Sequence, residues 1–194
     1  MRVDEGYIKF NLNWEKKSFD FNDTDFSALN FYRQELFESG LIGAYPDGIG
    51  FGNISMRYDK HNFIISGSET GNLKNLSKEH YALVEAFNIK ENRVHCVGLT
   101  KASSESLSHA AIYKINLNVN GVIHVHNQEM WKRYIHKLPT TNKDAEFGTP
   151  GMASEISRYA GKSHGVIIMG GHPEGIISYG ITLNDAYNEL HKYF

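Results

Sequence analysis

Residues 121–127 read Gly-Val-Ile-His-Val-His-Asn, a segment that carries both a fold signal and a chemical one. Its β-branched residues, bounded by a glycine, predict a strand over 122–126. Side chains alternate between the two faces of a strand, so His124 and His126 project from one face while Val125 points the other way, into the core. Two neighbouring imidazoles supply half of a tetrahedral zinc shell. Strands that bind no metal also show this pattern, so a metal site requires a third ligand.

A third histidine follows the next predicted strand, residues 165–169. His172 stands in the glycine-rich segment Met169–Gly175, where a loop side chain can reach across a site. Together with His124 and His126 it would give three protein ligands and leave one position open, as in catalytic zinc sites. Taken alone, His172 fits an ordinary loop residue equally well.

Periodicity along the rest of the chain predicts an α+β fold. Predicted helices cover residues 24–39, 105–116, 153–159 and a last segment from the Thr182–Asp185 capping box through Leu190. Predicted hairpins pair 54–58 with 63–65 and 82–89 with 93–99, although 82–89 also fits a helix. Antiparallel pairs and helices occur without regular βαβ alternation, which favours a mixed-sheet sandwich.

Three short polar segments have both a structural and a functional interpretation. In Ser103-Ser104-Glu105 a serine can cap the helix over 105–116, with Glu105 in its first turn complementing the helix dipole. Gly52-Asn53 and Ser66-Gly67 are residue types usual in turns. Each segment alone is explained without any catalytic role.

Length and composition limit the class of protein. The 194 residues suit one domain, 1–194, with 1–22 as an N-terminal lead-in. The single cysteine, Cys96, excludes an internal disulfide and lies in an apolar segment, where we expect a buried thiol. No apolar run is long enough to cross a membrane, and charges within the first five residues do not fit a signal peptide, so we expect a cytoplasmic protein. A net charge of −2 without a Lys/Arg cluster disfavours nucleic acid and membranes as partners.

Five segments in this order and spacing resemble the class II aldolase/adducin family, in particular its L-fuculose-phosphate aldolase-like members. The resemblance covers about residues 26 to 192. The segments are Gly52–Ser55 with Arg57, Ile65–Gly67 with Thr70–Leu73, Ala102–Glu105 with His109, Val122–Asn127, and His172 with Gly175–Gly180. Any one of them would be a weak signal, whereas their combination is specific.

The resemblance implies a single-domain fold with a central, largely antiparallel sheet flanked by helices. It assigns one divalent metal ion, expected to be zinc, to His124, His126 and His172, and the acid/base role to Glu105. It assigns the substrate phosphate to small donors and backbone amides beside the start of the helix over 105–116. These phosphate-binding residues are Asn53, Ser66, Gly67, Ser103 and Ser104.

Two departures from the family pattern leave positions open. The pair Pro173-Glu174 makes the turn after the third ligand position two residues longer, which keeps His164 as an alternative to His172. Family aldolases also use tyrosines in a C-terminal segment that extends beyond this sequence. The aldolase-type proton donor is therefore unassigned, and Tyr134 and Tyr179 are candidates by residue type alone.

The activity that the resemblance implies is metal-dependent aldol cleavage of a small phosphorylated ketose through a metal-stabilised enediolate. Epimerases, dehydratases and decarboxylases of the same fold use the same chemistry, and the sequence does not separate them. A non-enzymatic, adducin-like interaction module is disfavoured by the three histidines and Glu105 together. A purely structural ion is disfavoured because only three protein ligands align. We expect a homo-oligomer, most simply a cyclic tetramer.

Overall fold

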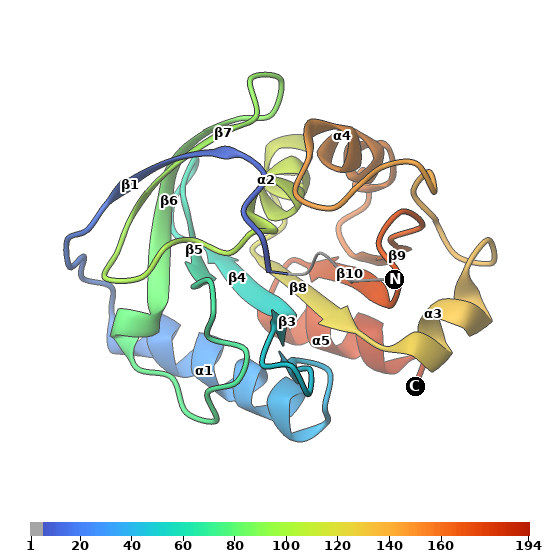
Figure 1. The fold of residues 1–194 in the computed structure, drawn as a ribbon, viewed down its shortest axis with the longest axis horizontal. Coiled ribbons are helices and arrows are strands. Elements are labelled where there is room, and N and C mark those ends of the chain that lie inside the picture. Colours follow the sequence, from blue (N-terminus) through green and yellow to red (C-terminus); the bar gives the residue numbers. More distant parts are fainter. Residues whose placement is uncertain (1–5) are drawn as a thin grey trace.

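The computed structural model describes residues 6–194, which are built on one eight-stranded sheet (Figure 1). Its strands follow the order β1-β7-β6-β5-β4-β8-β10-β9. Their bounds are β1 Asn11–Glu15, β4 Asn53–Arg57, β5 Phe63–Ser66, β6 Tyr81–Asn88, β7 Arg93–Val97, β8 Gly121–His126, β9 Gly165–Ile168 and β10 Gly175–Gly180. Neighbouring strands pair antiparallel except β1, which runs parallel to β7. The largely antiparallel sheet expected from the sequence is confirmed.

Helices cover both faces of this sheet (Figure 1). α1 (Asp23–Glu38) and α5 (Leu183–His191) pack on one face, and α2 (Ser106–Ile115) and α4 (Pro150–Tyr159) pack on the other. The short helix α3 (Gln128–Tyr134) follows directly after β8, and the 3-10 turn η1 (Lys78–His80) precedes β6. A separate pair of two-residue strands, β2 (Gly43–Ala44) and β3 (Gly50–Phe51), forms a small hairpin. The expected α/β architecture is thus three layers deep.

Strand β8 contributes to the apolar cores on both sides of the sheet. Val122 belongs to the cluster beneath α2 and α4, whereas Ile123 and Val125 belong to the cluster beneath α1 and α5. Because side chains alternate along a strand, the even-numbered positions face α2 and α4. His124 and His126 therefore point to that side, as the sequence predicts.

Most predicted elements are confirmed, and the ambiguous one is resolved. Residues 82–88 belong to strand β6, which is hydrogen-bonded to strands on both sides. The Thr182 capping box is present, since the Thr182 hydroxyl accepts from the Asp185 amide and the Asp185 carboxylate accepts from the Thr182 amide. Cys96 is buried in β7, as expected. Helix α4 begins earlier than predicted because Thr149 caps it and Pro150 occupies the first turn.

Strand β1 lies within the segment expected to be a lead-in. Its exposed asparagines alternate with Leu12 and Trp14, which pack against the core. The parallel partner β7 is about 80 residues away in sequence, so this pairing depends on tertiary structure rather than on a local hairpin signal. The first five residues of the predicted lead-in lie outside the described residues. The sequence also does not predict α3 or β10.

None of the helices within residues 6–194 has both the length and the apolar character of a membrane-spanning segment.

Candidate metal centre

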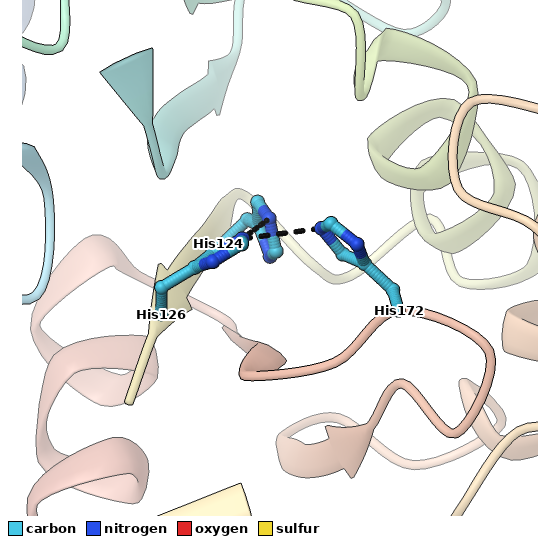
Figure 2. A group of neighbouring side chains, drawn as sticks. All are labelled: His124, His126 and His172. Carbon is cyan, nitrogen blue, oxygen red and sulfur yellow. Dashed lines mark hydrogen bonds between the residues drawn. The ribbon is translucent and has the colours of Figure 1, made fainter. Parts of the chain in front are cut away.

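Three histidine rings meet on the α2/α4 side of β8 (Figure 2). The Nε2 atom of His126 lies 3.2 Å from Nε2 of His124 and 3.1 Å from Nε2 of His172. Two nitrogens bound tetrahedrally to zinc at about 2.05 Å are about 3.3 Å apart, so the two separations from His126 suit one shared ion. The ligand atoms of the three histidines all lie within 4.8 Å of one another. All three residues are buried, with at most 4% of their surface exposed. The structure therefore brings together the three histidines that are expected as ligands from the sequence.

The lengthened turn between β9 and β10 delivers His172 to this cluster. Backbone hydrogen bonds close the turn, from the His172 amide to Met169 O (3.1 Å) and from the Gly175 amide to His172 O (2.9 Å). Gly175 is required here because a Cβ at this position would overlap the His172 ring. Phe147 packs against the ring, with centroids 4.7 Å apart. The two additional residues are therefore compatible with ligand placement.

The hydrogen bonds around the rings indicate which nitrogens hold lone pairs. His124 Nδ1 lies 3.1 Å from the carbonyl oxygen of Ile176, which can only accept a hydrogen bond, so Nδ1 carries the proton. In the neutral ring, Nε2 then directs its lone pair toward His126 and His172. A set of converging imidazole nitrogens suits zinc and several other divalent first-row ions. The residues present thus fit a divalent metal ion.

His164, the alternative metal ligand, and the two candidate proton donors, Tyr134 and Tyr179, make contacts away from the histidine cluster. His164 is exposed and pairs with the Glu189 carboxylate at 3.6 Å. Tyr179 is buried and donates a hydrogen bond to Tyr159 O at 3.0 Å, and burial raises the pKa of its phenol. Tyr134 packs against a tyrosine near the C-terminus. These contacts do not involve the clustered rings, so none of the three side chains is assigned to the site.

Glu105 lies at the start of α2 but outside its first turn. The helix begins at Ser106, and Glu105 itself is the N-cap residue, so the predicted serine cap is wrong. The reason is a tight turn before the helix, in which Ser103 O accepts from the Ser106 amide at 3.0 Å. The Glu105 side chain does not cap the helix. Its carboxylate is buried and accepts a hydrogen bond from Ser108 Oγ at 2.5 Å, so it is held inside the protein.

A small polar pocket brings Glu105 together with most of the predicted phosphate-binding residues. It is lined by Gly6, Gly50–Asn53, Gly67–Gly71 and Ser103–Glu105. A backbone bridge between Gly67 and Ala102 holds two of these segments side by side. Ser66 is not part of the lining, and its hydroxyl accepts a hydrogen bond from the Ile54 amide at 3.1 Å. The structure thus gathers four of the five predicted residues.

Two residues near the cluster are not identified by the sequence patterns. The Tyr45 hydroxyl lies 2.8 Å from His126 Nδ1 and donates a hydrogen bond to the Glu174 carboxylate at 3.0 Å. Tyr45 belongs to the small hairpin and packs on Phe51, with ring centroids 4.7 Å apart. No periodic pattern in the sequence points to Tyr45 as a residue of the site. The position of Glu174 in the lengthened turn is the sequence feature that could have identified it.

Comparisons with known proteins agree with this geometry. The family model for the Class II Aldolase and Adducin N-terminal domain matches residues 46–193. L-fuculose-1-phosphate aldolase from Thermus thermophilus shares the fold with a TM-score of 0.64 and 20% identity, over 89% of this chain and 90% of that chain. YgbL from Klebsiella pneumoniae is described by the alternatives aldolase, epimerase and decarboxylase. It shares the fold with a TM-score of 0.66 and 17% identity, over 87% of this chain and 84% of that chain. A sugar-phosphate aldolase from Thermotoga maritima shares the fold with a TM-score of 0.63 and 14% identity, over 87% of this chain and 90% of that chain.

No curated protein sequence matches the chain. Identities this low show a common fold and do not transfer an activity. The family match is broader evidence, because it spans most of the chain and includes the three histidines, Glu105 and Asn53. The chain therefore belongs to the class II aldolase and adducin N-terminal domain family.

Proposed function

We propose that the protein is a metal-dependent aldolase that cleaves a carbon–carbon bond of a small phosphorylated ketose. The observation that carries the proposal is the convergence of His124, His126 and His172 on the sheet face next to a polar pocket. A divalent ion on these nitrogens, which we propose to be zinc, would supply Lewis acidity to the carbonyl and neighbouring hydroxyl of the substrate. All other steps fall to groups of this chain.

The pocket supplies the groups that a phosphate requires. Ser103 and Ser104 offer hydroxyls at the start of α2, where the helix dipole favours negative charge. Gly67 adds a segment of backbone without a side chain. The buried Oδ1 of Asn53 has no hydrogen-bond partner among the described residues. Oδ1 can accept a hydrogen bond from a substrate hydroxyl, and the Nδ2 amide of the same side chain can donate one to a phosphate oxygen. These features support binding of a phosphorylated substrate.

Glu105 is the proposed acid/base. Its carboxylate is buried, and the short hydrogen bond from Ser108 fixes its orientation. It shares the pocket with Asn53, whose direct cross-strand partner is the ligand residue His124. A carboxylate in this position can move a proton to or from the substrate carbon beside the carbonyl, a role that positioned carboxylates commonly fill. Ser108 is accordingly a positioning residue for Glu105.

The alternative is an epimerase, dehydratase or decarboxylase built on the same site. One observation favours it: the phenolic proton donor expected of a family aldolase is unassigned. The ring contact of Tyr134 and the hydrogen bond of Tyr179 lie elsewhere, and Tyr45 meets His126 at Nδ1 rather than at the converging Nε2. Such reactions differ from aldol cleavage in what happens to the substrate, and fold alone does not decide among them. A non-enzymatic adducin-like module is less well supported, because a scaffold has no need for three converging buried imidazoles.

The test is product analysis with purified, metal-loaded protein. Phosphorylated ketoses and sugar acids are offered separately, and NMR identifies an aldehyde fragment, an epimer, or loss of water or carbon dioxide. Release of an aldehyde that requires the metal supports the aldolase. The matched control is the His124→Ala/His126→Ala variant, prepared in parallel. Turnover of equal rate by that variant would contradict any role of the cluster, and turnover without an aldehyde would select the alternative.

A further inference from the structure

We propose that Tyr45 and Glu174 form a hydrogen-bond relay that fixes the ring of His126 in the tautomer required for metal binding. The relay connects three elements of the fold: the small β2–β3 hairpin, strand β8 and the turn before β10. It deepens the proposed function, since it rests on the proposed metal centre. Both relay residues act through His126, so they are positioning residues.

The direction of the relay follows from counting protons. The Tyr45 oxygen lies 3.0 Å from Oε2 of Glu174 and 2.8 Å from Nδ1 of His126. An ionised carboxylate can only accept, and a phenol has one proton, so that proton goes to Glu174. The phenol oxygen must then accept from His126, which places a proton on Nδ1. Nε2 is left with its lone pair, and Nε2 is the atom that faces His124 and His172.

The backbone at Glu174 supports a specific role for its side chain. Its φ is +70°, in the left-handed region that side chains disfavour and glycine adopts freely. The Glu174 carbonyl also accepts from the Asn127 amide at 3.0 Å, directly after β8. This bond ties the turn to the strand that carries His126. A glutamate in a glycine-like conformation is consistent with a need for its carboxylate rather than for the turn shape alone.

The opposite end of the relay is equally constrained. The Tyr45 amide donates to Ile49 O at 2.9 Å, which closes the hairpin around the tyrosine. The Tyr45 ring packs on Phe51, and Phe51 in turn packs on the His126 ring, with centroids 5.4 Å apart. The phenol oxygen therefore has little freedom to leave His126. His124 reaches the same tautomer through a backbone carbonyl, so the two rings of the His-X-His pair are oriented by different partners.

A carboxylate behind a ligating histidine makes the ring a better donor, and losing such a partner typically weakens metal affinity about 10- to 100-fold. Tyr45→Phe removes the hydroxyl and keeps the ring. We expect it to weaken zinc binding at least about 10-fold in competition with a chelator, relative to wild type. Glu174→Gly removes the carboxylate without backbone strain and should also weaken binding. Tyr58→Phe, at an exposed tyrosine, is the matched control and should bind as wild type does.

A double-mutant cycle separates a relay from two independent packing roles. Because Glu174 acts through Tyr45, the Tyr45→Phe/Glu174→Gly variant should bind zinc no more weakly than Tyr45→Phe alone. Glu174→Gln retains an acceptor for the phenol and should recover most of the affinity lost in Glu174→Gly. Losses that add in the double variant, or no recovery with glutamine, would overturn the relay.

A spectroscopic measurement on metal-free protein gives a readout independent of metal affinity. Long-range proton–nitrogen NMR of the histidine rings, at a pH where they are neutral, should show His126 with its proton on Nδ1 in the wild type. In Tyr45→Phe the His126 proton should move partly to Nε2. An unchanged His126 tautomer in this variant would contradict the proposal. If the wild type binds no zinc, the metal centre fails while this spectrum still decides the relay.

Discussion

Asn53 and His124 lie directly opposite each other on the antiparallel strands β4 and β8. Opposed residues on such strands point to the same face, with Cβ atoms about 4.5–5.5 Å apart. Asn53 lines the polar pocket, and His124 belongs to the histidine cluster. This one pair therefore joins the proposed phosphate site to the proposed metal site. A substrate anchored in the pocket by its phosphate would extend toward the three rings.

Replacing Asn53 should weaken substrate binding without affecting the metal. A hydrogen bond to a charged group contributes about 1.5–3 kcal/mol, so Asn53→Ala should raise KM for a phosphorylated substrate at least about 10-fold. Steady-state kinetics and zinc analysis on the same preparation measure both quantities. The control is Asn118→Ala, at an exposed position outside the pocket. If KM for the non-phosphorylated analogue rose by the same factor, Asn53 would not bind the phosphate.

The metal content is the most direct measurement of the centre. We expect about one divalent ion per chain in protein dialysed against zinc, because the three proposed ligands form one cluster that could hold a single ion. The His124→Ala/His126→Ala variant should lose the ion, whereas His164→Ala, at the exposed histidine, should keep it. Elemental analysis by mass spectrometry decides, with circular dichroism to verify folding. Wild-type stoichiometry in the double variant would place the metal elsewhere.

The fold was predictable where a local pattern coincides with tertiary structure. Strand β8 is such a case, because its alternation separates His124 and His126 from Val125, and the two faces meet different cores. Strand β1 is the opposite case. Its parallel partner β7 is remote in sequence, and only Leu12 and Trp14 mark its buried face. Local periodicity cannot report a pairing of that kind.

Sequence segments predicted which residues gather at the candidate site, but they did not predict the hydrogen bonds of the side chains. The family pattern located the three histidines and Glu105, but it placed Ser66 in the pocket, where the structure shows a hydroxyl committed to a backbone amide. The contact between Tyr45 and Glu174 spans 129 residues and depends on a left-handed backbone in a lengthened turn. Such a contact becomes visible only when the chain is folded.

The oligomeric state is a further prediction. We expect a closed homo-oligomer, most simply a tetramer, on the family resemblance and the general preference for closed symmetry. Size-exclusion chromatography with light scattering at micromolar concentration should give a mass of about four chains of 22.0 kDa. A mass equal to one chain would rule out the prediction and would exclude any site residue contributed by a neighbouring subunit.

His109 should make stability depend on pH. It is fully buried, its Nδ1 lies 2.6 Å from Ser55 Oγ, and burial lowers its pKa to about 3. An unfolded histidine has a pKa of about 6.5, so below that pH the unfolded state binds a proton that the folded state does not. The stability is fully present above about pH 6.5 and falls by up to about 1.4 kcal/mol per pH unit as the pH decreases toward 3.

The measurement is urea unfolding at pH 7, 6 and 5, with a chelator present so that metal binding does not contribute. His109→Gln should be less stable than wild type at pH 7, because it disturbs the buried contact with Ser55. The slope of its free energy of unfolding against pH should nevertheless be smaller than that of the wild type, by the equivalent of about one bound proton. Parallel pH profiles of the two proteins would show that folding does not lower the pKa of His109.

The last prediction concerns Glu105, the proposed acid/base. Glutamine matches the size of glutamate and keeps an oxygen that can accept the hydrogen bond from Ser108, so Glu105→Gln should retain the fold and the metal. It cannot accept or return a proton, and losing such a group typically lowers the rate about 10²–10⁴-fold. The measurements are kcat, zinc content and thermal unfolding on one preparation. Ser108→Ala leaves the carboxylate but removes its fixed orientation, so it should lower kcat by a smaller factor. Loss of zinc in Glu105→Gln would make Glu105 a ligand instead, and full activity would reduce it to a residue at the start of a helix.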